Sequence, residues 1–364
     1  MQYPKRIFLT GGTGFLGSQI LKLILENNKS EVFLLIRPKG GQSIERRFEE
    51  LFLQLFPNKK DRNFLREKIK LLQGDVVKGR FGLDGVSYQK LISEVEEIYH
   101  CAALAEFRQP LSRVRKHNVE GTKNVLEFAR QCKNLNKMNY VSTAFIAGNL
   151  IGRFSEQDLD VGQSFNNTYE QSKFEGELLV KEYVTKGIKV AIYRPSIVGG
   201  IYDNGYTDNF RMFYQPFRTI SLSLLPKIPI SNFGILNLIP CDYAAKAIYL
   251  LSISRNKVDT YHIVGLENFS VKYLMRFTSN FFKYKEPKYI NLSKFNINEY
   301  SPLVRQILKV YIPYFNFGAI FDCEKTKRIL LSLGFSYPKV DESYLSRIFE
   351  YSYKEGYIKK SLCR

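Results

Sequence analysis

The chain has 364 residues, of which 45% are hydrophobic and 24% charged, a balance typical of a globular protein with a sizeable core. Lysine and arginine outnumber aspartate and glutamate by 54 to 35, which gives a formal net charge of +19. No apolar run approaches the roughly 18 residues that a membrane span needs. No signal peptide precedes the first predicted strand, so we expect a cytoplasmic protein.

The cysteines and histidines exclude two common classes of site. Neither a disulfide framework nor a metal site is expected, because only three histidines are present and no cysteine pair has CxxC spacing. The five cysteines are Cys101, Cys132, Cys241, Cys323 and Cys363.

The positive charge bears on the partners that we expect. A chain this basic should attract polyanions, such as nucleic acid, a phosphorylated cofactor, an acidic carrier protein or, peripherally, an anionic membrane surface. The charge is spread along the chain and no nucleic-acid-binding motif is present, so we expect no specific nucleic acid partner.

Short apolar runs alternate with helical patterns through the first 200 residues, which predicts a parallel sheet covered by helices on both faces. The helical patterns are Phe15–Asn27, a stretch from Ile44 to Phe56, Pro110–Lys133, and the segment that follows Tyr169. The predicted strands are RIFLT (6–10), EVFLLI (31–36), KIKLLQGD (68–75), VEEIYHCAA (95–103), KMNYVST (137–143) and KVAIYRP (189–195).

Beyond Gly199 the alternation loosens into a stretch rich in aromatic, proline and basic residues. LNLIP (236–240), a helix from about Tyr243 and TYHIVG (260–265) predict a return to the sheet. From Ser270 onward we expect helices and loops, including a helix with Tyr344 and Ile348 on its buried face.

The pattern as a whole predicts an α/β fold: a doubly wound parallel Rossmann sheet with a smaller, mostly helical substrate-side lobe. We expect the nucleotide-binding domain over residues 1–200, completed by about 236–265. Residues 201–235 and 266–364 would form the lobe.

A glycine-rich turn joins the first strand to the first helix. In TGGTGFLG the glycines allow the backbone N–H groups to approach a dinucleotide pyrophosphate, which the positive end of the helix attracts. The predicted cofactor contacts in this turn are Gly11, Thr13, Gly14, Phe15, Leu16 and Gly17.

The end of the second strand indicates which dinucleotide binds. An NAD site usually has an acidic residue there, but IRPKG places Arg37 at this point. A guanidinium suits the 2′-phosphate of NADP, and Arg47 could add a second contact. We therefore expect NADP(H), with a solvated loop charge as the alternative interpretation of Arg37.

Further candidates for cofactor contacts lie where other predicted strands end. Asp75 could accept from the adenine amine, and the small Ala102 and Ala103 leave room for ribose. Each of these residues could equally serve a turn or the core. Pro195, at the end of the sixth strand, completes the predicted set.

The catalytic candidates are a hydroxyl, a phenol, an ammonium and an amide. Thr143 ends the fifth strand, Tyr169 and Lys173 stand four apart on the next helix, and Asn118 lies on the preceding one. Hydride addition to a carbonyl needs a proton donor and support for the oxyanion. We expect Lys173 to lower the pKa of Tyr169, Thr143 to hold the substrate oxygen, and Asn118 to brace the helix or a relay water.

These motifs together resemble the extended short-chain dehydrogenase/reductase family. TGGTGFLG, HCAA, HNVEGTKNVL, VSTAF, YEQSK and YRPSIVGG occur in the family's order. Arg37, FRQPL, the glutamates of YEQSKFEGE and LNLIPCDYAAKAI are similar to the thioester-reductase and fatty acyl-CoA reductase branch, also called the male-sterility type. FDCEKTKRILLSLGF adds a weaker likeness.

The resemblance implies NADPH-dependent reduction of an acyl thioester, on CoA or a carrier protein, to an aldehyde and in some members an alcohol. It assigns Thr143, Tyr169 and Lys173 the catalytic roles. The branch commonly has a valine-asparagine or similar pair where Ala105 and Glu106 stand, so the acidic Glu106 is a departure from its pattern. The aromatic, basic stretch 211–230 could line an acyl channel or pack a core.

Four other functions are left open. A sugar-nucleotide epimerase or dehydratase and a 3-hydroxysteroid-type dehydrogenase share the fold, and a catalytically silent NADP sensor is a third alternative. A cysteine-based acyl reductase would use Cys101, but the adjacent His100 should point to the opposite face of its strand.

Overall fold

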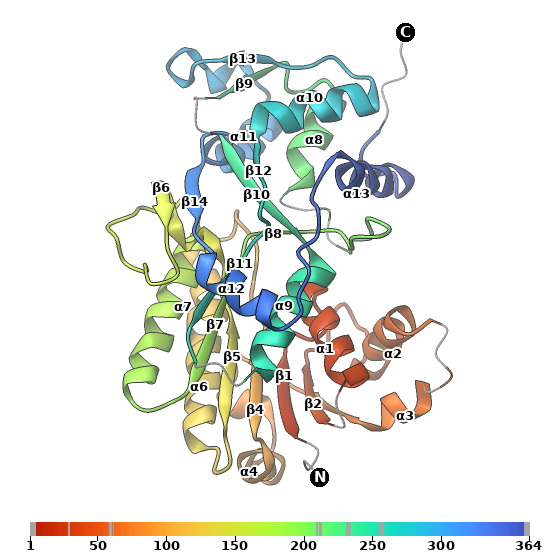
Figure 1. The fold of residues 1–364 in the computed structure, drawn as a ribbon, viewed down its shortest axis with the longest axis vertical. Coiled ribbons are helices and arrows are strands. Elements are labelled where there is room, and N and C mark those ends of the chain that lie inside the picture. Colours follow the sequence, from red (N-terminus) through yellow and green to blue (C-terminus); the bar gives the residue numbers. More distant parts are fainter. Residues whose placement is uncertain are drawn as a thin grey trace.

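The computed structural model describes residues 5–27, 30–57, 60, 62–208, 210, 213–230, 234–254 and 258–359. At its centre a seven-stranded sheet has the order β11-β7-β5-β4-β1-β2-β3, and every ladder in it is parallel (Figure 1). The strands are β1 (Arg6–Thr10), β2 (Glu31–Ile36), β3 (Ile69–Gln73), β4 (Glu97–His100), β5 (Lys137–Val141), β7 (Val190–Pro195) and β11 (Thr260–Ile263). The predicted doubly wound Rossmann sheet is confirmed.

Helices cover both faces of this sheet, because its apolar strands are buried on both sides. One face carries α1 (Phe15–Asn27), α2 (Ile44–Leu55) and α9 (Cys241–Ile253), whose apolar side chains join those of β1 and β2 in one core cluster. The other carries α4 (Gly85–Glu94), α6 (Gly121–Gln131) and α7 (Thr168–Thr185), packed with a second cluster. The short α3 (Arg62–Glu67) leads into β3.

The predicted helix Pro110–Lys133 is interrupted in its middle. It consists of α5 (Leu111–Arg115), a single π-helical turn (Lys116–Glu120) and α6. Such π-bulges recur at functional sites, and this one contains Asn118.

The parallel register brings the carboxyl ends of four strands together. Thr10 is paired with His100, His100 with Tyr140, and Val141 with Tyr193. Motifs far apart in the chain therefore meet at one edge of the sheet, below the C-terminal lobe (Figure 1).

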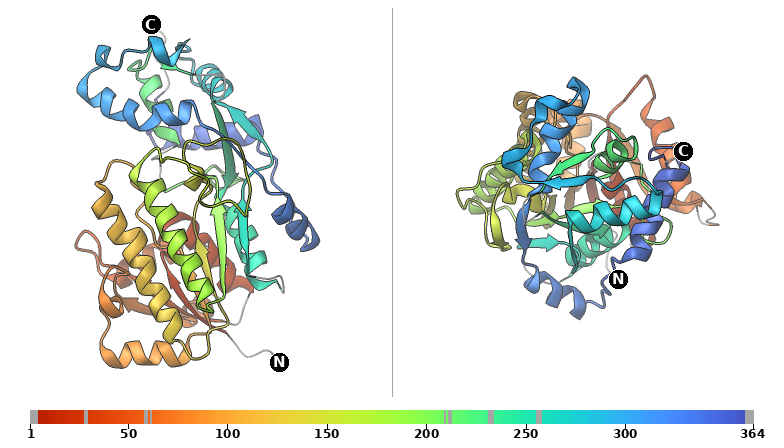
Figure 2. Two further views of the ribbon diagram at one scale, coloured as in Figure 1. Left: turned by 90° about the vertical axis from the view of Figure 1, so that its left-hand side faces the viewer. Right: turned by 90° about the horizontal axis from the view of Figure 1, so that it is seen from above.

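The lobe above this edge is built mainly from helices. These are α8 (Tyr214–Ser221), α10 (Val271–Phe282), α11 (Pro302–Phe315) and α13 (Glu342–Lys354). A two-stranded ladder of β9 (Lys227–Pro229) and β13 (Lys288–Ile290) lies at its far end (Figures 1 and 2). The predicted helix with Tyr344 and Ile348 on its buried face is α13.

One expected strand lies in a different sheet. LNLIP forms most of β10 (Ile235–Pro240), which pairs with β8 (Ile197–Gly199) and β12 (Asn268–Ser270) in a separate three-stranded sheet. The prediction that it rejoins the central sheet is wrong. Its apolar pattern indicates a buried strand but not its neighbours, and β11 occupies the position beside β7.

A segment near the C-terminus packs against the nucleotide-binding domain. β14 (Gly318–Phe321) pairs with β6 (Ile151–Phe154), and α12 (Glu324–Ser332) packs against α9 and β11. These two strands were not predicted. In the described part of the chain, no helix is both long and apolar enough to cross a bilayer.

Candidate active site

The turn between β1 and α1 is a tight cradle that excludes side chains at two positions. Gly11 has φ +73°, and a Cβ there would lie 2.4 Å from the backbone nitrogen of Ala102. A Cβ on Gly17 would lie 2.2 Å from the Gly11 carbonyl oxygen. At Gly14 only that same oxygen is near, at 3.3 Å, so its outer side has room for a ligand. Such a turn at the first βα junction fits a dinucleotide pyrophosphate.

Two arginines lie together next to this turn. A nitrogen of the Arg47 guanidinium donates to the Arg37 carbonyl oxygen, and another lies 3.4 Å from the Thr13 hydroxyl. Arg37 is half exposed, with its guanidinium 3.5 Å from Asp75 and 3.4 Å from the His117 ring. Burial, followed by the charge of Arg37, lowers the pKa of Arg47. The positive charges of these two arginines next to the turn favour a bound anion.

Asp75 makes the contacts of one of its expected roles. Its carboxylate faces Arg37 with one oxygen and accepts from the Val77 nitrogen with the other, at 3.2 Å. These are the contacts of a turn aspartate that also orients an arginine, rather than those of a group turned toward an adenine.

A single cavity joins the predicted reactive residues to the C-terminal lobe. It has a volume of about 320 Å³ and extends from the carboxyl edge of the sheet to α8, α10 and α11 of the lobe. Its lower wall contains these candidates from the sequence: Phe15, Leu16, Ala103, Thr143, Tyr169, Lys173 and Pro195. Asn118 and Ala102 are not among the residues that line it.

Tyr169 and Thr143 are two of the polar residues of the wall. Thr143 caps a short 3₁₀ helix, accepting from Phe145 N at 3.2 Å, and its hydroxyl lies 3.4 Å from the Pro195 carbonyl oxygen. Burial raises the pKa of the half-buried Tyr169 to about 12, although a hydrogen bond with Thr143 opposes the shift. The charge of Glu170 raises it further.

Lys173 is buried and has other partners than the expected one. Its ammonium donates to the Tyr140 hydroxyl at 2.9 Å and to the Val141 carbonyl oxygen at 2.8 Å. Burial lowers its pKa to about 8, with the carboxylate of Glu177 opposing. The expectation that Lys173 lowers the pKa of Tyr169 is wrong for this structure, because the ammonium is turned toward Tyr140.

Asn118 braces the site from the π-helical turn. Its side-chain oxygen accepts from Leu104 N at 2.7 Å, and its nitrogen donates to the Leu104 carbonyl at 3.2 Å and to the Ser172 hydroxyl at 2.9 Å. It therefore ties the loop after β4 to α7. Of its two expected roles, these contacts are those of the brace.

A buried ion pair beside the site was missed in the sequence. Arg194 and Glu177 are both fully buried, with the Arg194 Nε 3.0 Å from one carboxylate oxygen. The Ser142 hydroxyl donates to the other oxygen at 2.6 Å. The signal was present in YEQSKFEGE, since Glu177 stands one turn after Lys173 on the same face of the helix.

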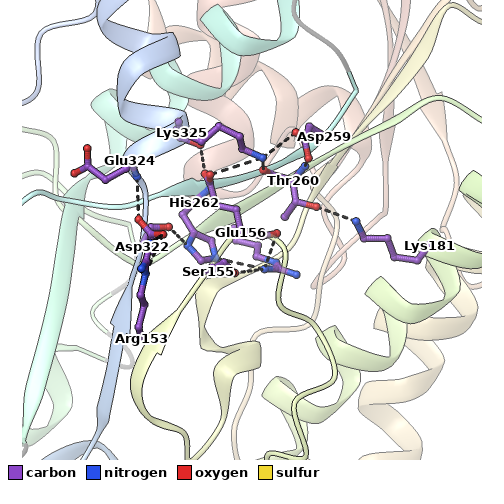
Figure 3. A network of polar contacts seen from close by, with 12 residues as sticks. Arg153, Ser155, Glu156, Lys181, Asp259, Thr260, His262, Asp322, Glu324 and Lys325 are labelled. Carbon is purple, nitrogen blue, oxygen red and sulfur yellow. Dashed lines mark hydrogen bonds and ion pairs between the residues drawn. The ribbon is translucent and has the colours of Figure 1, made fainter.

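This pair continues into a polar network on the β11 side of the sheet (Figure 3). The His262 ring lies 3.4 Å from Arg194 and 2.7 Å from the Asp322 carbonyl oxygen, while Lys325 pairs with Asp259 at 2.8 Å. Lys181 of α7 donates to the Thr260 hydroxyl at 3.0 Å. The network thereby fastens α7 to β11 and to the segment that contains β14 and α12.

The remaining candidates are less well placed for catalysis. Burial raises the pKa of Cys101 to about 12 and lowers that of His100 to about 3. His100 is engaged by the hydroxyls of Thr10 and Thr122, at 2.7 and 3.1 Å, so it cannot activate the thiol. Glu106 accepts from Gln109 at 3.0 Å and lies outside the cavity lining.

Comparison with known proteins places this site in a family. Residues 9–248 match the NAD-binding family described as male sterility protein. Fatty acyl-CoA reductase 1 of Homo sapiens is 30% identical over 270 residues, covering 65% of this chain and 52% of that protein. The chain thus spans about half the length of the curated reductases that it matches.

Two further proteins are similar along almost the whole chain. A linear gramicidin synthase of Brevibacillus parabrevis is 25% identical over 373 residues, covering 96% of this chain and 7% of that protein. The crystal structure of the terminal R domain from the myxalamid PKS-NRPS biosynthetic pathway superposes with a TM-score of 0.83 and 24% identity, covering 99% of this chain and 93% of that one. The chain therefore belongs to the male sterility protein family, an NAD-binding branch of the extended short-chain dehydrogenase/reductases.

Proposed function

We propose that this protein reduces an acyl thioester with NADPH, releasing a thiol and an aldehyde. The observation that carries the proposal is the cavity, which is lined by Thr143, Tyr169 and Lys173 together with many apolar side chains of the C-terminal lobe. The names of the relatives, fatty acyl-CoA reductase and linear gramicidin synthase, agree with a thioester substrate.

The apolar walls suit an acyl chain. They include Phe213, Phe217, Leu274, Met275 and Phe315, contributed by α8, α10, α11 and the residue ahead of α8. Each methylene taken out of water there would contribute about 0.8 kcal/mol. Arg211 and Met212, which begin the stretch expected to line a channel, lie outside the described residues. Phe213 and Phe217 both line the cavity and pack the lobe's core, which supports a channel wall that is also part of the core.

The bound cofactor would supply a hydride to the thioester carbonyl carbon. The carbonyl electrons move to oxygen, which Thr143 and Tyr169 hold by hydrogen bonds. Tyr169 keeps its proton at neutral pH because its pKa is about 12, so it is ready to protonate this oxygen. Lys173, charged below about pH 8, would help to hold the cofactor beside Tyr169.

The resulting hemithioacetal then collapses without a further redox step. Its carbon–sulfur bond breaks, the hydroxyl proton passes to sulfur, and the carbonyl reforms as an aldehyde. Tyr169 recovers a proton from solvent. The same residues could reduce the aldehyde to an alcohol with a second hydride, since that step also needs one proton donor.

We assign the cofactor as NADPH on the pair of arginines. Arg37 and Arg47, with the Thr13 hydroxyl, would hold a 2′-phosphate by charge-assisted hydrogen bonds. Gly11, Gly14 and Gly17 would hold the pyrophosphate, while Leu16, Ala103 and Pro195 would pack against the nicotinamide ribose. The net charge of +19 suits a thioester carried by CoA or by an acidic carrier protein.

The proposal is tested by following NADPH absorbance with long-chain acyl-CoA, acyl carrier protein thioester and free aldehyde in turn. Tyr169→Phe should lower kcat by about 10²–10⁴-fold, with thermal stability retained. Tyr353→Phe, on the exposed face of α13, is the matched control and should keep the full rate. Turnover of a nucleotide sugar, with no NADPH oxidation by any thioester, would show that the proposal is wrong.

A further inference from the structure

A buried carboxylate follows the proposed proton donor in the sequence. Glu170 follows Tyr169 on α7, and its side chain is completely removed from solvent. One carboxylate oxygen accepts from the Tyr314 hydroxyl at 2.5 Å, and the other accepts from Asn166 N at 2.9 Å. In the described part of the chain its stabilising partners are neutral hydrogen-bond donors rather than cations.

Its main partner, Tyr314, belongs to the C-terminal lobe. Tyr314 lies on α11 of the C-terminal lobe, and its ring stacks on Phe107 with centroids 5.6 Å apart. Phe107 in turn lies 5.9 Å from the Tyr169 ring. Asn167, the cap of α7, donates to the Tyr314 hydroxyl at 2.6 Å. All three rings line the cavity, so one tyrosine contacts the substrate space, the first turn of α7 and Glu170.

The charge of Glu170 acts on Tyr169. Burial raises the pKa of Glu170 to about 7, and the hydrogen bonds, with that of Tyr314 the largest, oppose the shift. In its ionised form Glu170 raises the pKa of Tyr169. The same charge therefore makes Tyr169 a weaker acid, and its neutralisation makes Tyr169 a stronger one.

The surroundings contain few other charges that could dominate this effect. The groups around the carboxylate are Tyr314 from α11, Asn166 and Asn167 ahead of α7, and Tyr169 on α7 itself. Three charged residues lie in the adjoining segments. Lys173 is turned to Tyr140, and Glu106 accepts from Gln109. Arg108 lies in the loop between Glu106 and Gln109.

We propose that Glu170 is a positioning residue that sets the acidity of Tyr169, and that Tyr314 couples this setting to the C-terminal lobe. The inference rests on the proposed function, because it concerns the proton that Tyr169 gives to the substrate oxygen. When Glu170 takes up a proton from solvent, the neighbouring negative charge is lost and proton transfer from Tyr169 becomes easier. Tyr314, by donating to the carboxylate, determines at which pH this occurs.

The first experiment measures kcat/KM for thioester reduction from pH 5.5 to 9 in four proteins. The wild type should show a several-fold fall as pH rises through about 7, where Glu170 ionises. Glu170→Gln should lose this step. Tyr314→Phe should move it to higher pH, because the donor that favours the ionised carboxylate is removed.

The matched control is Glu175→Gln on the same helix. Glu175 pairs with Arg115 at 2.6 Å and does not contribute to the pKa shift of Tyr169, so this variant should keep the wild-type step. A step that persists unchanged in Glu170→Gln, or that moves to lower pH in Tyr314→Phe, would overturn the inference. A merely structural role would change the rate at all pH values alike.

A second measurement does not depend on turnover. Glu170 has a pKa near 7 in the folded protein and 4.5 as a free side chain, so the folded state binds the extra proton in this window. Stability should then fall as pH rises from about 4.5 to 7. The difference in Tm between pH 5 and pH 8 should be several degrees smaller in Glu170→Gln than in the wild type, and unchanged in Glu175→Gln.

The two measurements separate the inference from the proposed function. An equal Tm difference in Glu170→Gln and wild type overturns the inference even if thioesters are reduced. A Glu170-dependent Tm difference without thioester turnover supports the titration of Glu170 and refutes the proposed function instead.

Discussion

The buried pair of Arg194 and Glu177 allows a quantitative prediction. Glu177→Gln keeps the shape of the side chain but leaves the fully buried Arg194 without its counter-charge and weakens the bond from Ser142. Removing one partner of a buried ion pair costs about 3–5 kcal/mol. With an unfolding entropy of about 2.1 cal/mol/K per residue, a chain of 364 residues has about 0.76 kcal/mol/K in total. If the whole chain unfolds in one cooperative step, this loss of free energy lowers the Tm of the variant by about 4–7 °C.

Thermal unfolding followed by circular dichroism measures this loss. The matched control is Glu182→Gln, on the exposed side of the same helix, which removes the ion pair with Lys186. Since both members of that pair are about half exposed, the control should lie within about 1 °C of the wild type. If Glu177→Gln shifts Tm no more than Glu182→Gln does, Glu177 does not stabilise the buried charge of Arg194 as the structure indicates.

Three further predictions concern the cofactor and the pH dependence. Gly17→Ala should raise the Kd for NADPH at least about tenfold, because its Cβ would meet the Gly11 carbonyl, whereas Gly85→Ala, with no atom near, should bind normally in calorimetry. Arg37→Ala should weaken NADPH by about 10–100-fold, as loss of a charge-assisted hydrogen bond implies, and leave NADH unchanged; equal losses for both cofactors would contradict the assignment. The reduction rate should fall as pH rises through about 8, where Lys173 loses its proton, and a profile that is flat from pH 7 to 9 would exclude that role.

The central layers of the fold could be predicted because their signals are local. β1, β2 and α1 have the bounds that were expected, since each is an apolar run of the right length ended by glycines or polar residues. The meeting of Thr143 and Tyr169 at one cavity followed from the rule that parallel strands end at one edge. Strand neighbours are set by tertiary contacts, so LNLIP was correctly expected as a strand and wrongly assigned to the central sheet.

The partners of the reactive groups could not be predicted in the same way. Tyr314 is 144 residues away from the glutamate that it contacts, and no pattern in the sequence joins the two. The ammonium of Lys173 donates to two acceptors from another element, and spacing along a helix does not predict them. The choice of Tyr140 is made by β5, which places that hydroxyl and the Val141 carbonyl beneath α7.

The helix that carries the site shows why hydrophobic periodicity alone would have missed it. The buried face of α7 includes Glu170, Lys173 and Glu177, where a structural helix would have apolar residues. Burying such groups is unfavourable unless each has partners, and each does have them: Tyr314, Tyr140 and Arg194 in turn. Those partners come from a different helix and two different strands, so the rest of the chain must be folded before this face is stable. Charged residues at the spacing that predicts an apolar face are therefore a signal that the helix packs against polar partners, and in YEQSKFEGE they single out the glutamates as well as the lysine.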